Sequence, residues 1–101
     1  MIIREWRGRS SRDRVEAYPA HFRNVVLPEL RGIAGFVSAT LSRRDQGETI
    51  EYLVLTRWQS IDAIRAFAGN APDKAVVEPS AVATLTDYDD SVRHYEVVED
   101  V

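Results

Sequence analysis

The period of the apolar residues constrains this chain most, because it switches between strand and helix spacing along the sequence. Residues 2–7 (IIREWR) mix β-branched and aromatic side chains, which is typical of a strand. Across residues 11–30 the apolar side chains recur at helical spacing, which predicts an amphipathic helix. Pro19 removes a helical hydrogen bond, so we expect a kink there or a helix that starts near it. We expect Gly8 and Ser10 to end the strand, with Ser10 as the cap of the helix.

Two alternating segments follow, and both predict strands. Residues 36–45 (FVSATLSRRD) and 49–58 (TIEYLVLTRW) are separated by a short turn, in which Gly47 supplies the positive φ that a tight hairpin needs. We therefore expect these two strands to pair antiparallel. After them, Ser60 is a suitable N-cap for a second helix, which Gly69 ends.

The C-terminal part completes the pattern. Residues 73–77 (DKAVV) predict a short helical piece that Pro79 ends. Residues 80–90 predict a loop with at most one turn, and residues 91–100 (SVRHYEVVED) predict a strand. The order strand–helix–strand–strand–helix–strand predicts an α+β chain with a ferredoxin-like βαββαβ plan and a four-stranded antiparallel sheet. We expect residues 1–101 to form a single domain.

Both faces of the expected sheet carry apolar side chains. In the strand 49–58, Tyr52 and Trp58 point to one face, and Leu53 and Leu55 point to the other. The helices of one such unit cover only one face, so the other face predicts a homodimer with two-fold symmetry. The alternative is a surface with scattered apolar residues, which are normal when they occur singly.

Composition excludes several classes of protein. The 101 residues are 45% hydrophobic and 29% charged, which is a globular rather than a disordered composition. A net charge of −3 argues against a nucleic-acid partner, including RNA. With no cysteine there is no disulfide or thiolate metal site, which fits a cytoplasmic protein. The first residues lack the apolar core of a signal peptide, and no apolar run approaches the roughly 20 residues that cross a membrane.

The two histidines are the first candidates for catalysis. Neither His21 nor His94 belongs to a pair with metal-ligand spacing, so we expect no metal site. Of the two we favour His94, because its neighbours Arg93 and Tyr95 point to the opposite face of the sheet. A histidine there can act as a general base on a phenol or an activated carbon acid. The alternative is that both histidines are ordinary surface or core residues.

Arg4 is the second catalytic candidate, because an arginine that faces a cavity needs a partner. That partner is either a substrate carboxylate or phenolate, or an internal glutamate such as Glu96. Inward-facing aromatic side chains predict a substrate pocket, with a filled aromatic core as the alternative. The pocket candidates are Trp6, Tyr18, Phe22, Tyr52, Trp58 and Phe67.

Three segments, REWRG (4–8), TRWQSIDAIRAF (56–67) and RHYEVV (93–98), together with the element order, resemble the antibiotic biosynthesis monooxygenase family. The resemblance implies a dimeric α+β barrel with a cavity between sheet and helices in each protomer. It also implies two kinds of activity: some members oxidise polycyclic aromatic substrates with O₂ and no metal or flavin, and others degrade haem. At the strand–helix junction the resemblance implies a mainly structural role for Trp58.

Haem-degrading members pair a tryptophan with a histidine. Aligned on Trp58, these positions fall at Phe67 and near Val77, so the sequence argues against haem degradation. We therefore expect a monooxygenase-like enzyme that uses no cofactor and acts on a small aromatic or polyketide-like substrate. The alternative is a non-catalytic dimeric barrel that binds a small ligand or serves a stress-related role.

Overall fold

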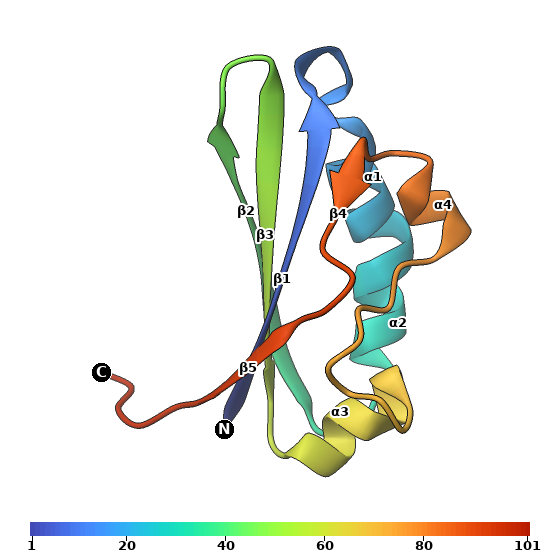
Figure 1. Cartoon of the computed structure of the whole chain (residues 1–101). Helices are drawn as coiled ribbons and strands as arrows, with labels where there is room; N and C mark the ends of the chain where they lie inside the picture. The colour runs from blue at the N-terminus through green and yellow to red at the C-terminus, as the bar shows by residue number, and fades with distance from the viewer.

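A computed structural model describes all residues, 1–101, as one antiparallel sheet with every helix on the same face (Figure 1). The sheet order is β2-β3-β1, and β4 and β5 lie one after the other along the free edge of β1. This arrangement confirms the α+β class and the ferredoxin-like plan. The elements are β1 (Ile2–Ser11), the 3₁₀-helix η1 (Arg12–Arg14), α1 (Ala17–His21), the π-helix η2 (Phe22–Val26), α2 (Leu27–Arg31), β2 (Phe36–Asp45), β3 (Thr49–Trp58), α3 (Ile61–Ala68), α4 (Pro79–Val82), β4 (Asp87–Tyr88) and β5 (Arg93–Glu96).

Strand β1 is longer than its local sequence suggests, so the expected break was wrong. It continues through Gly8 and Ser10, because it pairs along its whole length with β3. At Gly8 an added Cβ would lie only 2.7 Å from Cη2 of Trp6, which explains a glycine inside this strand. Ser10 is buried with its hydroxyl 3.2 Å from that of Tyr52, and it caps no helix.

The helical region 11–30 is divided, and the expected late start is confirmed. Helix α1 begins at Ala17, so Pro19 lies in the first turn, where its missing N–H is not needed. The carbonyl of Val15 is the group that this N–H would have met, and it accepts a hydrogen bond from the Tyr52 hydroxyl instead. Further on, the chain widens into η2, in which the N–H of Leu27 bonds to the carbonyl of Phe22, five residues back.

The central hairpin and the second helix are as predicted. Strands β2 and β3 have the expected bounds and pair antiparallel, and Gly47 has a φ of 87° in the turn between them. The Ser60 hydroxyl accepts a hydrogen bond of 3.2 Å from the N–H of Ala63, and α3 ends before Gly69, whose φ is 77°.

The segment after α3 differs from the prediction. Residues 73–77 are not helical, and Lys74 instead forms an isolated antiparallel bridge with Ser91. Pro79 begins the short helix α4 rather than ending one, because a first helical position needs no N–H.

The predicted strand 91–100 was also wrong in its bounds. Only Arg93–Glu96 forms β5, and β4 precedes it, so two short strands share the place of one edge strand. Between them the backbone bonds elsewhere: the carbonyl of Asp89 accepts from the Trp6 ring, and the N–H of Val92 donates to the carbonyl of Asp73.

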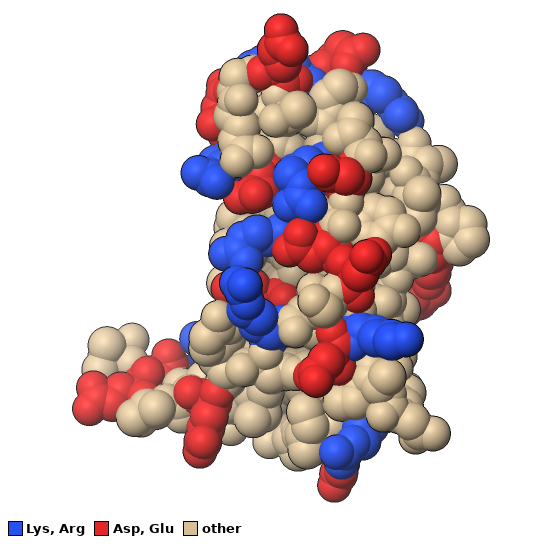
Figure 2. All heavy atoms as spheres, in the orientation of Figure 1, with Lys and Arg blue, Asp and Glu red and all other residues tan.

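The core lies between the inner face of the sheet and the helices. One cluster is built around Tyr18, Tyr52 and Val54, and a second around Leu30, Trp58 and Ile64. None of the helices has both the length and the apolar character needed to span a bilayer. Acidic and basic side chains are interspersed on the face seen in Figure 2, with no large patch of one sign.

Candidate functional site

A cavity of about 60 Å³ lies between the sheet and the helices. Its walls come from β1, β3, the helical region, α3 and the segment 76–78, and they are mostly apolar. Its polar lining residues are Arg4, Tyr18, His21, Glu29, Thr56 and Glu78.

The structure divides the predicted site residues into two groups. Arg4, Trp6, Tyr18 and Phe67 line the cavity. The residues that do not line it are Phe22, Tyr52, Trp58 and His94.

Tyr52 and Trp58 are core residues whose polar groups already have partners. Both are 0% exposed. The Tyr52 hydroxyl bonds to the carbonyl of Val15 and approaches Ser10, and the Trp58 ring N–H donates to Oγ1 of Thr56 at 2.8 Å. A buried tryptophan with a satisfied N–H at the end of β3 is placed to join strand and helices rather than to meet a ligand.

Trp6 and Tyr18 form an aromatic wall of the cavity. Their ring centroids are 5.6 Å apart, and the Trp6 ring N–H donates to the carbonyl of Asp89 at 2.9 Å. The Tyr18 hydroxyl makes no hydrogen bond with another residue, and burial raises the pKa of this phenol above its ordinary value. Tyr18 is therefore a neutral donor that remains available to a ligand.

Arg4 is a buried cation held by neutral groups. Its side chain donates to the carbonyls of Pro72 at 2.5 Å and Lys74 at 2.8 Å, and it packs 5.7 Å from the Phe67 ring centroid. Burial lowers the pKa of Arg4 to about 10, against a smaller opposing effect of Asp73, so the guanidinium is charged at neutral pH. The predicted pairing of Arg4 with Glu96 is wrong, because Glu96 is exposed and lies opposite Ile2 of β1 rather than Arg4.

His94 is occupied by Arg4 rather than free to act as a base. Its Nε2 lies 3.0 Å from Nη1 of Arg4, and a guanidinium only donates, so this nitrogen accepts. The ring proton is then on Nδ1, which lies 3.4 Å from the Asp73 carboxylate. Burial, followed by the charge of Arg4, lowers the pKa of His94, which keeps the ring neutral at pH 7.

His21, which ranked below His94 on sequence grounds, is the histidine that lines the cavity. It is 9% exposed, and its Nε2 is the only buried side-chain polar atom in the chain without a hydrogen-bond partner. It lies one helical turn after Tyr18, with ring centroids 6.0 Å apart. That spacing of three residues was the available signal, because it places both side chains on one face of the helix.

Two carboxylates, those of Glu29 and Glu78, lie at the rim of the cavity. A hydrogen bond with the Glu78 side chain, followed by burial and the charge of Glu78, raises the pKa of Glu29. The rim is therefore acidic, whereas the Arg4 side of the cavity is basic.

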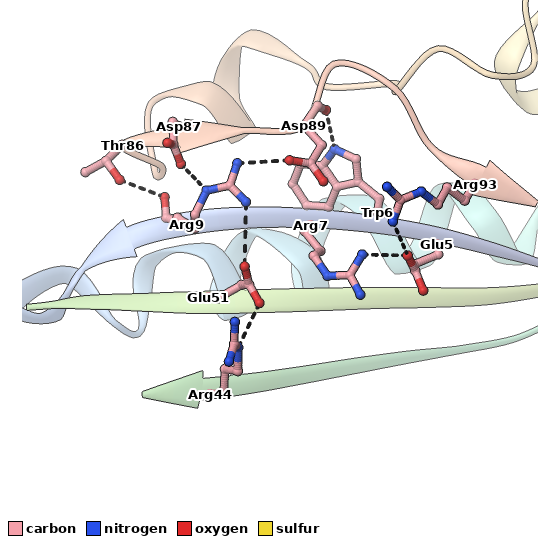
Figure 3. Close-up of polar contacts among 10 residues, drawn as sticks. All are labelled: Glu5, Trp6, Arg7, Arg9, Arg44, Glu51, Thr86, Asp87, Asp89 and Arg93. Atoms are coloured by element: carbon pink, nitrogen blue, oxygen red, sulfur yellow. Dashed lines mark hydrogen bonds and ion pairs between the residues drawn. The ribbon is translucent and has the colours of Figure 1, made fainter. Parts of the chain in front are cut away.

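The opposite face of the sheet carries a ladder of ion pairs (Figure 3). Arg9 contacts Asp89 at 3.0 Å and Glu51 at 3.7 Å, and Glu51 also accepts from Arg44 at 2.9 Å. The backbone carbonyl of Asp89 accepts the hydrogen bond from the Trp6 ring. The ion pairs of Asp89 on the outer face of the sheet therefore also hold Trp6 in the wall of the cavity.

The sequence model of the family described as antibiotic biosynthesis monooxygenase matches residues 1–79. The chain belongs to the antibiotic biosynthesis monooxygenase family. No curated protein matches it.

Several solved structures share its fold. A protein from Deinococcus radiodurans, described as an antibiotic biosynthesis monooxygenase, has 17% identity and a TM-score of 0.59 over 100% of this chain and 96% of its own. The heme-degrader MhuD from Mycobacterium tuberculosis, with two hemes in its active site, has 23% identity and a TM-score of 0.60 over 100% and 99%. SnoaB from Streptomyces nogalater, a cofactor-independent oxygenase, has 14% identity and a TM-score of 0.58 over 99% and 96%.

The cavity of this family member does not fit haem. The positions that the resemblance assigns to the tryptophan and histidine of haem-degrading members hold Phe67 and Val77, and both line the cavity as hydrocarbon side chains. The cavity volume of about 60 Å³ is below the roughly 300–1,000 Å³ of typical small-molecule sites, so any bound substrate requires the cavity to open.

Proposed function

We propose that the chain is a monooxygenase-like enzyme that needs no cofactor and oxidises a small aromatic or polyketide-like substrate in the cavity. The observation that carries this proposal is the unpaired Nε2 of His21 in a mostly apolar, aromatic-lined cavity. Membership of the antibiotic biosynthesis monooxygenase family supports it.

The chemistry starts with a proton transfer to His21. Nε2 takes the phenolic proton, and the electron pair of the phenolate forms a bond from an activated ring carbon to O₂. The resulting peroxide is protonated, and that carbon then loses its hydrogen as a proton while the O–O bond breaks. The phenol and O₂ thus become a quinone and water, with the substrate supplying all the electrons. General-base help of this kind contributes about 10²- to 10⁴-fold.

Neighbouring groups suit this role. Tyr18 offers a neutral O–H donor beside His21, able to hydrogen-bond the oxygen of the substrate or of the peroxide. The apolar lining excludes water, which strengthens both interactions.

Movement of the segment 76–78, which covers the cavity, provides the room that an aromatic ring needs. The backbone N–H groups of Val76, Val77 and Glu78 donate no hydrogen bond, and only the carbonyl of Glu78 accepts any, from Ala81 and Val82, so few backbone bonds hold this segment. Segments held in this way open at low cost, and a modest outward shift enlarges the cavity.

The proposal includes a homodimer formed through the outer face of the sheet. Figure 1 shows no helix on that face, and Leu53 and Leu55 lie there only half-buried. Its charges are largely paired within the chain, as in the contact of 2.5 Å between Arg7 and Glu5, so a second copy meets few free charges. Sedimentation equilibrium tests this: a mass that stays that of one chain at all concentrations contradicts it.

Oxygen uptake tests the enzymatic role. We expect the metal-free protein to consume O₂ with electron-rich phenols, and His21→Gln to lose about 10²-fold or more of that rate. The control is Asn24→Ala, an exposed position of η2, which keeps the rate within about twofold. The loss shrinks for phenols already ionised at the assay pH, because they need no base. Equal rates for wild type and His21→Gln contradict the proposal.

A second candidate function is ligand binding without turnover. The mostly apolar lining favours it, since such a lining binds an apolar ligand without supplying a reaction. It is distinguished by saturable binding of phenols with no O₂ uptake.

A further inference from the structure

Arg4 is a buried charge without a carboxylate in contact. Its residue is 5% exposed, and its three polar contacts are two backbone carbonyls and the neutral ring of His94. Buried charges are normally matched by an opposite charge, because desolvation is costly otherwise. The position is therefore electrostatically suited to a negative charge from outside the chain.

The donors of Arg4 are only partly used. A guanidinium carries five N–H donors, and the three contacts occupy two on Nη1 and one on Nη2. The Nε–H and the second Nη2–H make no hydrogen bond. Two donors fixed on one planar group match the two oxygens of a carboxylate.

The carbonyls of Pro72 and Lys74 hold this guanidinium in place before any ligand arrives. Bonds from both carbonyls and from His94 fix its plane, and Phe67 packs over it. A donor that is already oriented loses little freedom when it binds.

The charges around the cavity set a direction for an anion. Asp73 is the only carboxylate whose charge acts on Arg4, and its side chain is exposed and directed to His94. Glu29 and Glu78 line the rim and repel an anion from that side. The basic side at Arg4 is thus the favourable place for negative charge.

We propose that the cavity takes a small aromatic carboxylate, with its carboxylate on the free donors of Arg4 and its ring among Trp6, Phe67 and Tyr18. The inference rests on the proposed function in placing the ligand in this cavity. It adds the substrate class: a hydroxy-substituted aromatic acid, whose hydroxyl is directed to His21.

A matched pair of probes tests the charge. Isothermal titration calorimetry compares 4-hydroxybenzoate with 4-hydroxybenzamide, which has nearly the same shape and no charge. We expect wild type to bind the acid about 10- to 100-fold more tightly than the amide, as charge-assisted hydrogen bonds predict. Equal affinities, or no binding of either, overturn the inference.

Two variants assign the preference to Arg4. In Arg4→Gln we expect the acid and the amide to bind within about threefold of each other, and in Arg4→Lys we expect an intermediate preference because the fork is lost. Arg23→Gln, an exposed arginine without an ion pair, is the control and retains the full preference. A preference that survives in Arg4→Gln overturns the inference. If Arg4→Gln does not fold, the wild-type comparison and Arg4→Lys still decide.

The two proposals fail differently. Tight, Arg4-dependent binding of the acid without O₂ uptake supports the anion site and contradicts the oxygenase. If the acid and the amide are both oxidised and bind with equal affinity, the result supports the oxygenase and overturns the anion site.

Discussion

Replacing Tyr52 by Phe removes one hydroxyl from the centre of the core and leaves the ring. This hydroxyl is the partner of the Val15 carbonyl, which Pro19 cannot serve, and it lies 3.2 Å from the hydroxyl of Ser10. Because Tyr52 is 0% exposed, water does not replace the lost bonds without disturbing the packing. Leaving this part-buried carbonyl without its partner costs about 1–3 kcal/mol.

Thermal unfolding followed by circular dichroism measures this cost. For a domain of this size about 2 kcal/mol lowers Tm by about 8–16 °C. The matched control is Tyr95→Phe, since Tyr95 is 47% exposed and makes no side-chain hydrogen bond; its stability should change by less than about 0.5 kcal/mol. We expect Tyr52→Phe to bind phenols as the wild type does, because Tyr52 does not line the cavity. A Tm within 2–3 °C of the wild type, roughly 0.5 kcal/mol on the same scale, refutes the structural role of Tyr52.

Three further changes test local features. Ser60→Ala removes the N-cap bond of α3 and should cost about 1 kcal/mol in urea unfolding; an unchanged midpoint contradicts the cap. Gly35→Ala should destabilise strongly, since Gly35 has a φ of 90° and an added Cβ would lie 2.5 Å from that of Ala63, whereas Gly32→Ala should be tolerated; equal effects refute the steric argument. The lowered pKa of His94 means that the unfolded chain binds a proton first as pH falls below the ordinary value of 6.5. Stability should therefore fall below that pH and fall less in His94→Gln; identical pH profiles would contradict this.

Local patterns were enough for the parts of the fold that depend on neighbours in sequence. The hairpin of β2 and β3 follows from alternation and from Gly47, and the start of α3 from the Ser60 cap. The length of β1 was not predictable in this way. Ser10 has the sequence of a helix cap, but pairing with β3 and a contact with Tyr52 keep it in the strand.

The site was predictable in its walls and not in its chemistry. Strand periodicity placed Arg4 and Trp6 on the inner face, and helical periodicity placed Tyr18 there. The choice between the histidines depended on a contact between residues far apart in the sequence, in which Arg4 donates a hydrogen bond to Nε2 of His94. That contact leaves His21 as the histidine that lines the cavity and has an unpaired nitrogen.

A crystal structure of the protein with 4-hydroxybenzoate, prepared without oxygen, tests most directly whether this cavity is the functional site. We expect the carboxylate against Arg4, the hydroxyl within about 3 Å of Nε2 of His21, and the segment 76–78 displaced outward. A ligand bound only outside the cavity, or a cavity that stays closed at saturating ligand, would contradict it.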